Sequence, residues 1–122
     1  MKIRLYKDSL RLRVSPSETD KLTAGEVINE TFFWNKDHSL VFELIPDGSN
    51  KLDAVDHDNR WQICWSKDEI KKWSSSDDVG MYQTFEIDDN QHIKVAIEKD
   101  FACTGREGED KKDRYPNPKV NC

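Results

Sequence analysis

Four basic side chains are the first candidates for chemistry in this sequence. Arg4, Arg11 and Arg13 occupy alternate positions in two short segments near the start of the chain, and Lys94 lies in a similar segment near the end. A guanidinium group presents a planar fork of N–H donors that matches phosphate or carboxylate oxygens. The four side chains therefore predict a face that binds an anion. The alternative is that they pair with acidic neighbours across a solvated sheet.

Three glutamates alternate with apolar residues in the same way. Glu43, Glu86 and Glu98 could hold Mg²⁺ or carry out acid–base catalysis if the fold brought them together. Their spacing in the chain fixes no separation, so an exposed sheet face is the simpler interpretation. We group them with the basic residues as candidate ligand-binding positions and assign no catalytic residue.

The cysteines and histidines form no recognised metal-binding motif. The chain has three of each, without a Cys-x-x-Cys or His-x-x-x-His pair, and structural zinc sites use ligands at such spacings. Cys103 precedes Arg106 closely, and a thiolate there could be a nucleophile. We interpret it instead as an inert thiol. The sequence predicts no metal and no other cofactor.

Alternating apolar and polar residues predict the strands that carry these candidates. Residues 2–6 and 10–14 alternate on either side of a turn, which indicates a hairpin. Ser15 with Glu18, and Ser66 with Glu69, are capping-box pairs that predict two short helices. Further strands are expected at residues 26–34, 40–44, 52–55, 61–65, 81–87 and 93–97.

The tryptophans are divided between core and surface by the same patterns. Trp61, Trp65 and Trp73 fall on the apolar faces of the predicted strand and helix. Trp34 ends a strand beside a polar turn, where an indole would be partly exposed.

The predicted elements occur twice in the same order. A hairpin, a short helix and two strands occupy about residues 1–47, and the same plan recurs over residues 52–100. Periods near 50 residues are typical of repeats. We therefore expect one α+β domain over residues 1–100, with pseudo-duplicated β-β-α-β-β units. Its eight or so strands would form a mainly antiparallel sheet or a wide barrel. Residues 101–122 lose this pattern and predict an extended C-terminal tail, with Phe101 and Tyr115 held against the body.

This duplicated plan resembles the CYTH superfamily of class-IV adenylate cyclases and triphosphatases. Over about residues 1–100, the resemblance implies a wide barrel whose basic residues bind triphosphate and whose acidic residues hold metal. The family opens with a Glu-x-Glu-x-Lys strand. Here that strand reads Lys2-Ile3-Arg4-Leu5-Tyr6, so only the anion-binding part of the resemblance carries over.

The two ends of the chain resemble a second family. Residues 1–5 with 9–13, and residues 98–103 with 115–118, are similar to a group of small uncharacterised bacterial proteins that form a domain of unknown function. The resemblance spans the whole chain and implies no activity.

The overall charge narrows the expected partners. A formal net charge of −5 argues against a general nucleic-acid binder. The N-terminal residues lack the apolar run of a signal peptide, and no apolar stretch could span a bilayer, so a cytoplasmic location without a membrane partner is expected. The oligomeric state stays open.

Three functions follow from these observations. The preferred one is a small cytoplasmic domain that binds an anionic ligand on an Arg- and Lys-lined sheet face, with phosphorylated compounds among the candidate ligands. The first alternative is a protein–protein interaction domain without a small ligand. The second is a divalent-metal phosphohydrolase or cyclase with a degenerate CYTH-like site, so enzymatic activity is left open with a preference against it.

Overall fold

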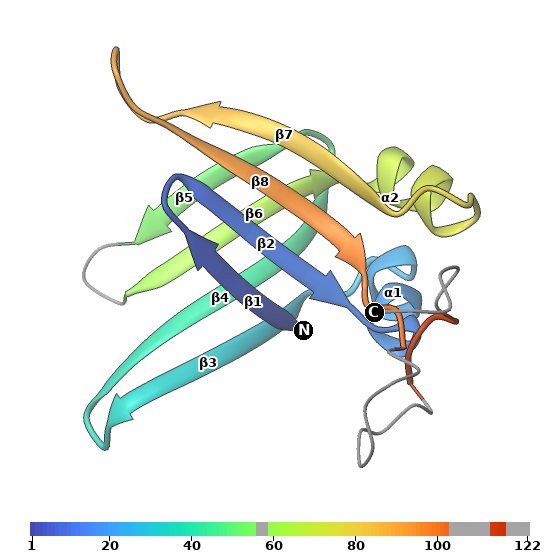
Figure 1. The fold of residues 1–122 in the computed structure, drawn as a ribbon, viewed down its shortest axis with the longest axis horizontal. Helices are drawn as coiled ribbons and strands as arrows, with labels where there is room; N and C mark the ends of the chain where they lie inside the picture. The colour runs from blue at the N-terminus through green and yellow to red at the C-terminus, as the bar shows by residue number, and fades with distance from the viewer. Residues whose placement is uncertain (56–58, 103–112, 117–122) are drawn as a thin grey trace.

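Within the described residues, the chain forms two short helices and eight strands, and the strands make two sheets (Figure 1). The computed structural model describes residues 1–55, 59–102 and 113–116. Cys103, Cys122 and most of the predicted tail therefore lie outside the described residues. In chain order the elements are β1 (Lys2–Tyr6), β2 (Ser9–Val14), α1 (Pro16–Thr23), β3 (Ile28–Asn35), β4 (His38–Asp47), β5 (Lys51–Val55), β6 (Arg60–Ser66), α2 (Lys67–Ser74), β7 (Gly80–Glu86) and β8 (His92–Lys99). The predicted α+β class and the repeated β-β-α-β-β order are confirmed.

Each sheet combines strands from both halves of the chain. Sheet A has the order β1-β2-β8-β7, and sheet B has the order β3-β4-β6-β5. In both, the central pair is parallel and the two outer pairs are antiparallel. Antiparallel pairing therefore predominates, as predicted. Of the two predicted arrangements, however, the wide barrel is wrong. No pairing joins an edge strand of sheet A to one of sheet B in the described chain, so both sheets stay open.

The core lies between the inner faces of the two sheets and under the helices. Leu12 and Ile97 contribute from sheet A, and Leu44 and Ile63 from sheet B, all with no exposed surface. The helices sit at one end of the sheets (Figure 1) and add three buried apolar residues to this cluster, Leu22, Ile70 and Trp73. Burying these side chains supplies the main favourable contribution to folding.

The two helices begin in different ways. At α1 the predicted capping box is complete, since Ser15 accepts from the Glu18 amide and Glu18 accepts from the Ser15 amide. At α2, Ser66 caps the Glu69 amide at 3.3 Å, but the Ser66 amide donates to Asn50 Oδ1 at 2.7 Å. The second predicted box is therefore half formed, because Asn50 takes the place of Glu69. Neither helix in the described part of the chain has the length and apolar content needed to cross a membrane.

The C-terminal residues fold back onto the first helix. The backbone N–H of Tyr115 donates to the Asp100 carbonyl oxygen at 2.9 Å, and the Tyr115 carbonyl oxygen accepts from the Ala102 N–H at 2.6 Å. Its ring lies edge-on to Phe101, 5.8 Å between centroids, and its hydroxyl donates to Thr19 Oγ1 at 2.9 Å. We call residues 99–102 and 113–116 the C-terminal clasp. The prediction that Phe101 and Tyr115 are held against the body is confirmed.

Candidate anion-binding site

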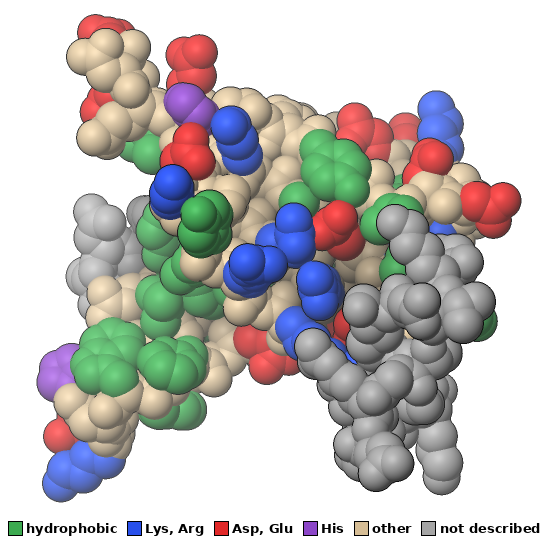
Figure 2. Space-filling view, viewed as in Figure 1, with side chains coloured by type: hydrophobic (Ala, Val, Ile, Leu, Met, Phe, Trp, Pro, Cys, Tyr) green, Lys and Arg blue, Asp and Glu red, His purple; other side chains and the backbone are tan. Residues whose placement is uncertain are grey.

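The outer face of sheet A carries all four predicted basic residues, and three of them, Arg4, Arg11 and Lys94, lie in two adjacent rows. Strand register aligns Arg4 with Arg11, Arg11 with Ala96, and Ala96 with Tyr82. These four side chains form one row across four strands. The next row brings Lys94 between Ser9 and Thr84. Alternation along each strand puts both rows on the same side of the sheet, the side that faces the viewer in Figure 2, where Lys and Arg side chains gather near the centre.

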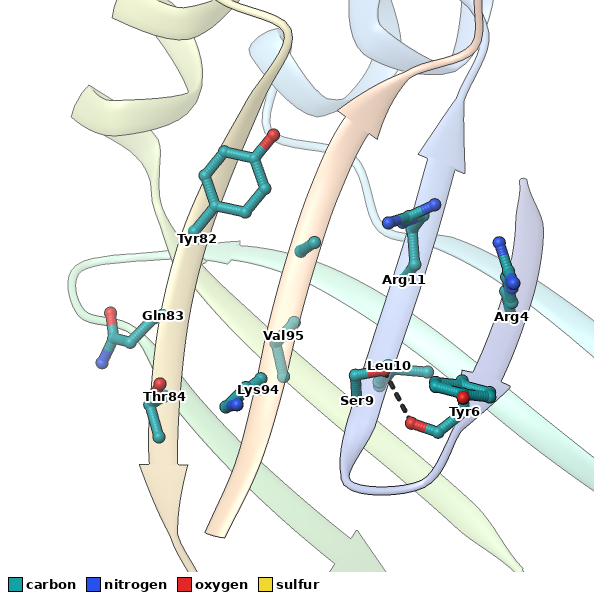
Figure 3. A pocket seen from close by; sticks show the side chains of 11 residues that line it. Arg4, Tyr6, Ser9, Leu10, Arg11, Tyr82, Gln83, Thr84, Lys94 and Val95 are labelled. Carbon is teal, nitrogen blue, oxygen red and sulfur yellow. Dashed lines mark hydrogen bonds between the residues drawn. The ribbon is translucent and has the colours of Figure 1, made fainter.

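A cavity of about 360 Å³ lies over these rows. Arg4, Arg11 and Lys94 line it, with Tyr6 and Tyr82 at its sides. Figure 3 shows Arg4 and Arg11 extending from neighbouring strands, with Tyr82 on the far side of β8. The small Ala96 separates Arg11 from Tyr82 in the row, and this leaves the space between the larger side chains open. No acidic side chain lines the cavity among the described residues.

Glu98 lies in the next row along β8, opposite Arg13, and contacts one residue on each side of the cavity. Its Oε1 accepts from Arg11 Nε at 2.8 Å, and its Oε2 accepts from the Tyr82 hydroxyl at 2.9 Å. The absence of a side chain at Gly80 leaves room for Glu98 to make these two contacts. A Cβ at that position would lie 2.8 Å from both Glu98 Cγ and the Ile97 carbonyl oxygen. Glu98 therefore orients both Arg11 and Tyr82.

The Tyr82 hydroxyl stays protonated at neutral pH. Desolvation is the main reason that its pKa lies above the ordinary value of 10.0, and the hydrogen bond to the negatively charged Glu98 raises the pKa further. A protonated hydroxyl can donate to one acceptor at a time, and Glu98 is that acceptor here. Tyr82 therefore forms part of the rim of the cavity, and its hydroxyl hydrogen bond is already used by Glu98.

The other basic residues have fewer acidic partners than Arg11. The Arg4 guanidinium lies 6.0 Å from the centre of the Tyr6 ring. Neither Arg4 nor Lys94 makes a salt bridge with a carboxylate within the described ranges. Arg13 is exposed in the row that holds Lys2 and Glu98, outside the lining of the cavity. Two cationic groups in the cavity are therefore without a carboxylate partner among residues 1–55, 59–102 and 113–116.

The three predicted glutamates do not converge. Glu43 is in sheet B, where it accepts from Arg60 Nη1 at 2.5 Å. Glu86 is at the end of β7 opposite His92, whereas Glu98 is opposite Gly80. Six residues of strand separate those two positions, roughly 20 Å. The shared carboxylate site required by the metal-enzyme alternative is absent from the described residues, and no cluster of three potential metal ligands occurs among them.

Sequence reasoning missed the aromatic rim of the cavity. Tyr82 occupies an outward position in β7 and Tyr6 one in β1, so alternation alone could have placed each on a polar face. What the sequence did not reveal is that β2 pairs with β8. That parallel pairing brings the hairpin residues Arg4 and Arg11 next to Lys94 and Tyr82.

Comparison with known protein families identifies the family of this chain. A family model described as a family of unknown function covers residues 1–119, as the resemblance at the two chain ends predicted. No curated protein and no solved structure matches the chain. The resemblance to the CYTH superfamily is not confirmed.

Proposed function

Because the chain belongs to this family of unknown function, DUF7009, we propose its function from its own residues: it binds a small phosphorylated anion on the outer face of sheet A. The observation that carries this proposal is the meeting of Arg4, Arg11 and Lys94 at one cavity of about 360 Å³. A volume of that size lies within the range of small-ligand sites.

The charge balance of the cavity supports an anionic ligand. Three cationic groups line it, and Glu98 neutralises part of the charge of Arg11 alone. Such a concentration of positive charge on a chain of net charge −5 has an energetic cost from local repulsion, which a bound anion would relieve.

The geometry favours a phosphate over an isolated carboxylate. Arg4 and Arg11 are opposite each other on adjacent strands, about 5 Å apart at the backbone. Lys94 approaches from a third strand. Donors from three directions suit the tetrahedral array of phosphate oxygens, while a single planar carboxylate uses one guanidinium fork.

The first test is thermal stabilisation of the protein by a panel of nucleotides, inorganic polyphosphates and organic acids. A ligand at 100 times its Kd stabilises the folded state by about 2.7 kcal/mol, which corresponds to a rise in Tm of roughly 10 °C for a domain of this size. We expect phosphorylated compounds to raise the Tm at low salt. We expect the effect to shrink in high salt, because the cavity is open to solvent and its charges are screened.

Two results of the panel would contradict the proposal. One is the absence of any Tm shift with phosphorylated compounds. The other is an equal shift with their uncharged analogues, which would show that charge does not contribute to binding.

A further inference from the structure

An apolar groove runs between the edge strands β1 and β3. A cavity of about 440 Å³ there is lined by Ile3 and Leu5 from β1 and by Phe32, Leu40 and Phe42 from sheet B. A second cavity of about 170 Å³ continues it, since Leu5, Leu40 and Phe42 line both. One end is closed where the Met1 amino group donates to Glu30 at 2.7 Å. Leu5 and Phe32 leave 62% and 64% of their surface exposed.

The strand that borders this groove is an unpaired edge. In the described chain, β1 pairs only with β2. Alternate residues of such a strand direct their backbone N–H and C=O groups away from the partner strand. A row of unpaired backbone groups next to an apolar groove is the arrangement that extended peptides use when they add a strand to a sheet.

The opposite side of the two sheets differs. On the side of β5 and β7, Asn50, just before β5, donates to Gln83 Oε1 of β7 at 2.6 Å, and the Phe85 ring of β7 packs edge-on against Trp65 of β6. These contacts close that side, although β5 and β7 are also edge strands. The side between β1 and β3 is therefore the one with room for additional side chains.

The charge on β1 determines what could bind there. Its outward side chains Lys2, Arg4 and Tyr6 alternate with the groove-facing Ile3 and Leu5. A strand beside β1 would direct one set of side chains into the apolar groove. The other set would lie next to Arg4, which has no carboxylate partner among the described residues, and next to Lys2, whose Nζ lies 3.2 Å from Asp100 Oδ2. We propose that the β1 edge binds an extended peptide in which acidic and apolar residues alternate.

Strand β1 of a second copy does not fit the same edge. If β1 paired with β1 of another molecule, Lys2 and Arg4 of each copy would lie beside the same residues of the other. Like charges opposite each other on adjacent strands destabilise the pairing. The occupant is therefore a partner peptide with acidic residues.

The experiment uses the full chain and three short capped peptides with a fluorescent label. In the first, glutamate and isoleucine alternate; in the second, the same residues form two blocks; in the third, lysine replaces glutamate. Fluorescence anisotropy measures binding, and hydrogen exchange identifies the protected strand. We expect the alternating acidic peptide to bind at least about tenfold more tightly than the other two, a difference of about 1.4 kcal/mol. We also expect it to slow exchange in β1 and not in β7.

The matched variants are Leu5→Asp and Ile87→Asp. Leu5 lines the groove, whereas Ile87 follows β7 at the other edge of sheet A and is similarly exposed, at 56%. Leu5→Asp should weaken the alternating peptide about tenfold, and Ile87→Asp should leave its affinity unchanged. Lys94→Ala should also spare peptide binding, because Lys94 is absent from the groove lining. Failure of the anion site and failure of this inference can therefore be told apart.

Several outcomes would overturn the inference. These are no binding of the acidic peptide, equal binding of the lysine peptide, or protection of β7 in place of β1. A dimer in light scattering with β1 already protected in the absence of peptide would identify a second copy as the occupant, and would also overturn it.

Discussion

Replacing Trp65 by Ala should destabilise the fold by about 3–5 kcal/mol, the range for removal of a large aromatic side chain from a packed core. Trp65 is 1% exposed. It comes from β6 of sheet B, and its ring contacts Phe85 of sheet A, so its removal leaves a cavity between the two sheets. A domain of this size would lose roughly 10–20 °C in Tm. Urea denaturation monitored by far-ultraviolet circular dichroism measures the change.

The matched control is the same substitution at Trp34. This indole is 52% exposed and stacks on His38, with 5.9 Å between ring centroids. Trp34→Ala should change the free energy of unfolding by less than about 1 kcal/mol, as expected for a surface position. If Trp34→Ala proved as damaging as Trp65→Ala, the packing of the two sheets described above would be incorrect.

Replacing Tyr115 by Ala should cost about 2–3 kcal/mol, because it removes a half-buried ring and a hydrogen bond. The ring contacts Phe101 and the hydroxyl donates to Thr19, so the substitution releases the C-terminal clasp from α1. Tyr6→Ala is the control, since Tyr6 is exposed in β1. Equal Tm values for Tyr115→Ala and the wild type would show that the clasp does not stabilise the domain.

Tyr115 also gives the clasp an alkaline pH dependence. Burial raises the pKa of its hydroxyl above the ordinary value of 10.0, and the nearby Asp20 and Asp113 carboxylates raise it further, against an opposing effect of the Thr19 hydrogen bond. The folded protein therefore retains this proton at a pH where the unfolded chain has lost it. Stability from this group is complete below pH 10 and falls as the pH rises from 10 towards the folded-state pKa. Tyr115→Phe has no hydroxyl to ionise. Over that pH interval, the free energy of unfolding of this variant should therefore fall less than that of the wild type.

The strands were predictable because their pattern is local. Leu10, Leu12 and Val14 alternate with Arg11 and Arg13, and the structure buries the three apolar residues. The same reasoning identified both helices, since Ser15 and Ser66 each cap an N-terminus. Buried Trp65 and Trp73 and exposed Trp34 follow from the same periodicity.

The partners of the strands were not predictable from local pattern. Alternation identifies which face of β2 is apolar, but it does not reveal that β2 pairs in parallel with β8, more than 75 residues away in sequence. The predicted half-units are each divided between the two sheets for this reason. The half-formed capping box at Ser66 has a similar origin, because the competing Asn50 side chain comes from a loop outside the motif.

The candidate site was predictable from the sequence only in part. Arg4, Arg11 and Lys94 were identified as a set by residue type and alternation, and the structure brings them to one cavity. Arg13 has the same residue type and face but falls in the row beyond the cavity. Glu43 and Glu86 are elsewhere, and Glu98 serves to orient Arg11. Whether a residue lies in a row over the cavity depends on the register between β2 and β8. Residue type alone does not determine that register.

The most direct test of anion binding is a calorimetric titration of the protein with inorganic triphosphate at low salt. The variants are Lys94→Glu and Lys72→Glu. Lys94 lines the cavity, and Lys72 is an exposed lysine of α2 outside it. The same change in net charge thus affects the site in one variant only. We expect saturable binding to the wild type and to Lys72→Glu, and an affinity at least about tenfold lower for Lys94→Glu, or about 1.4 kcal/mol. Absence of binding to the wild type, or equal affinities of the two variants, would contradict an anion site on sheet A.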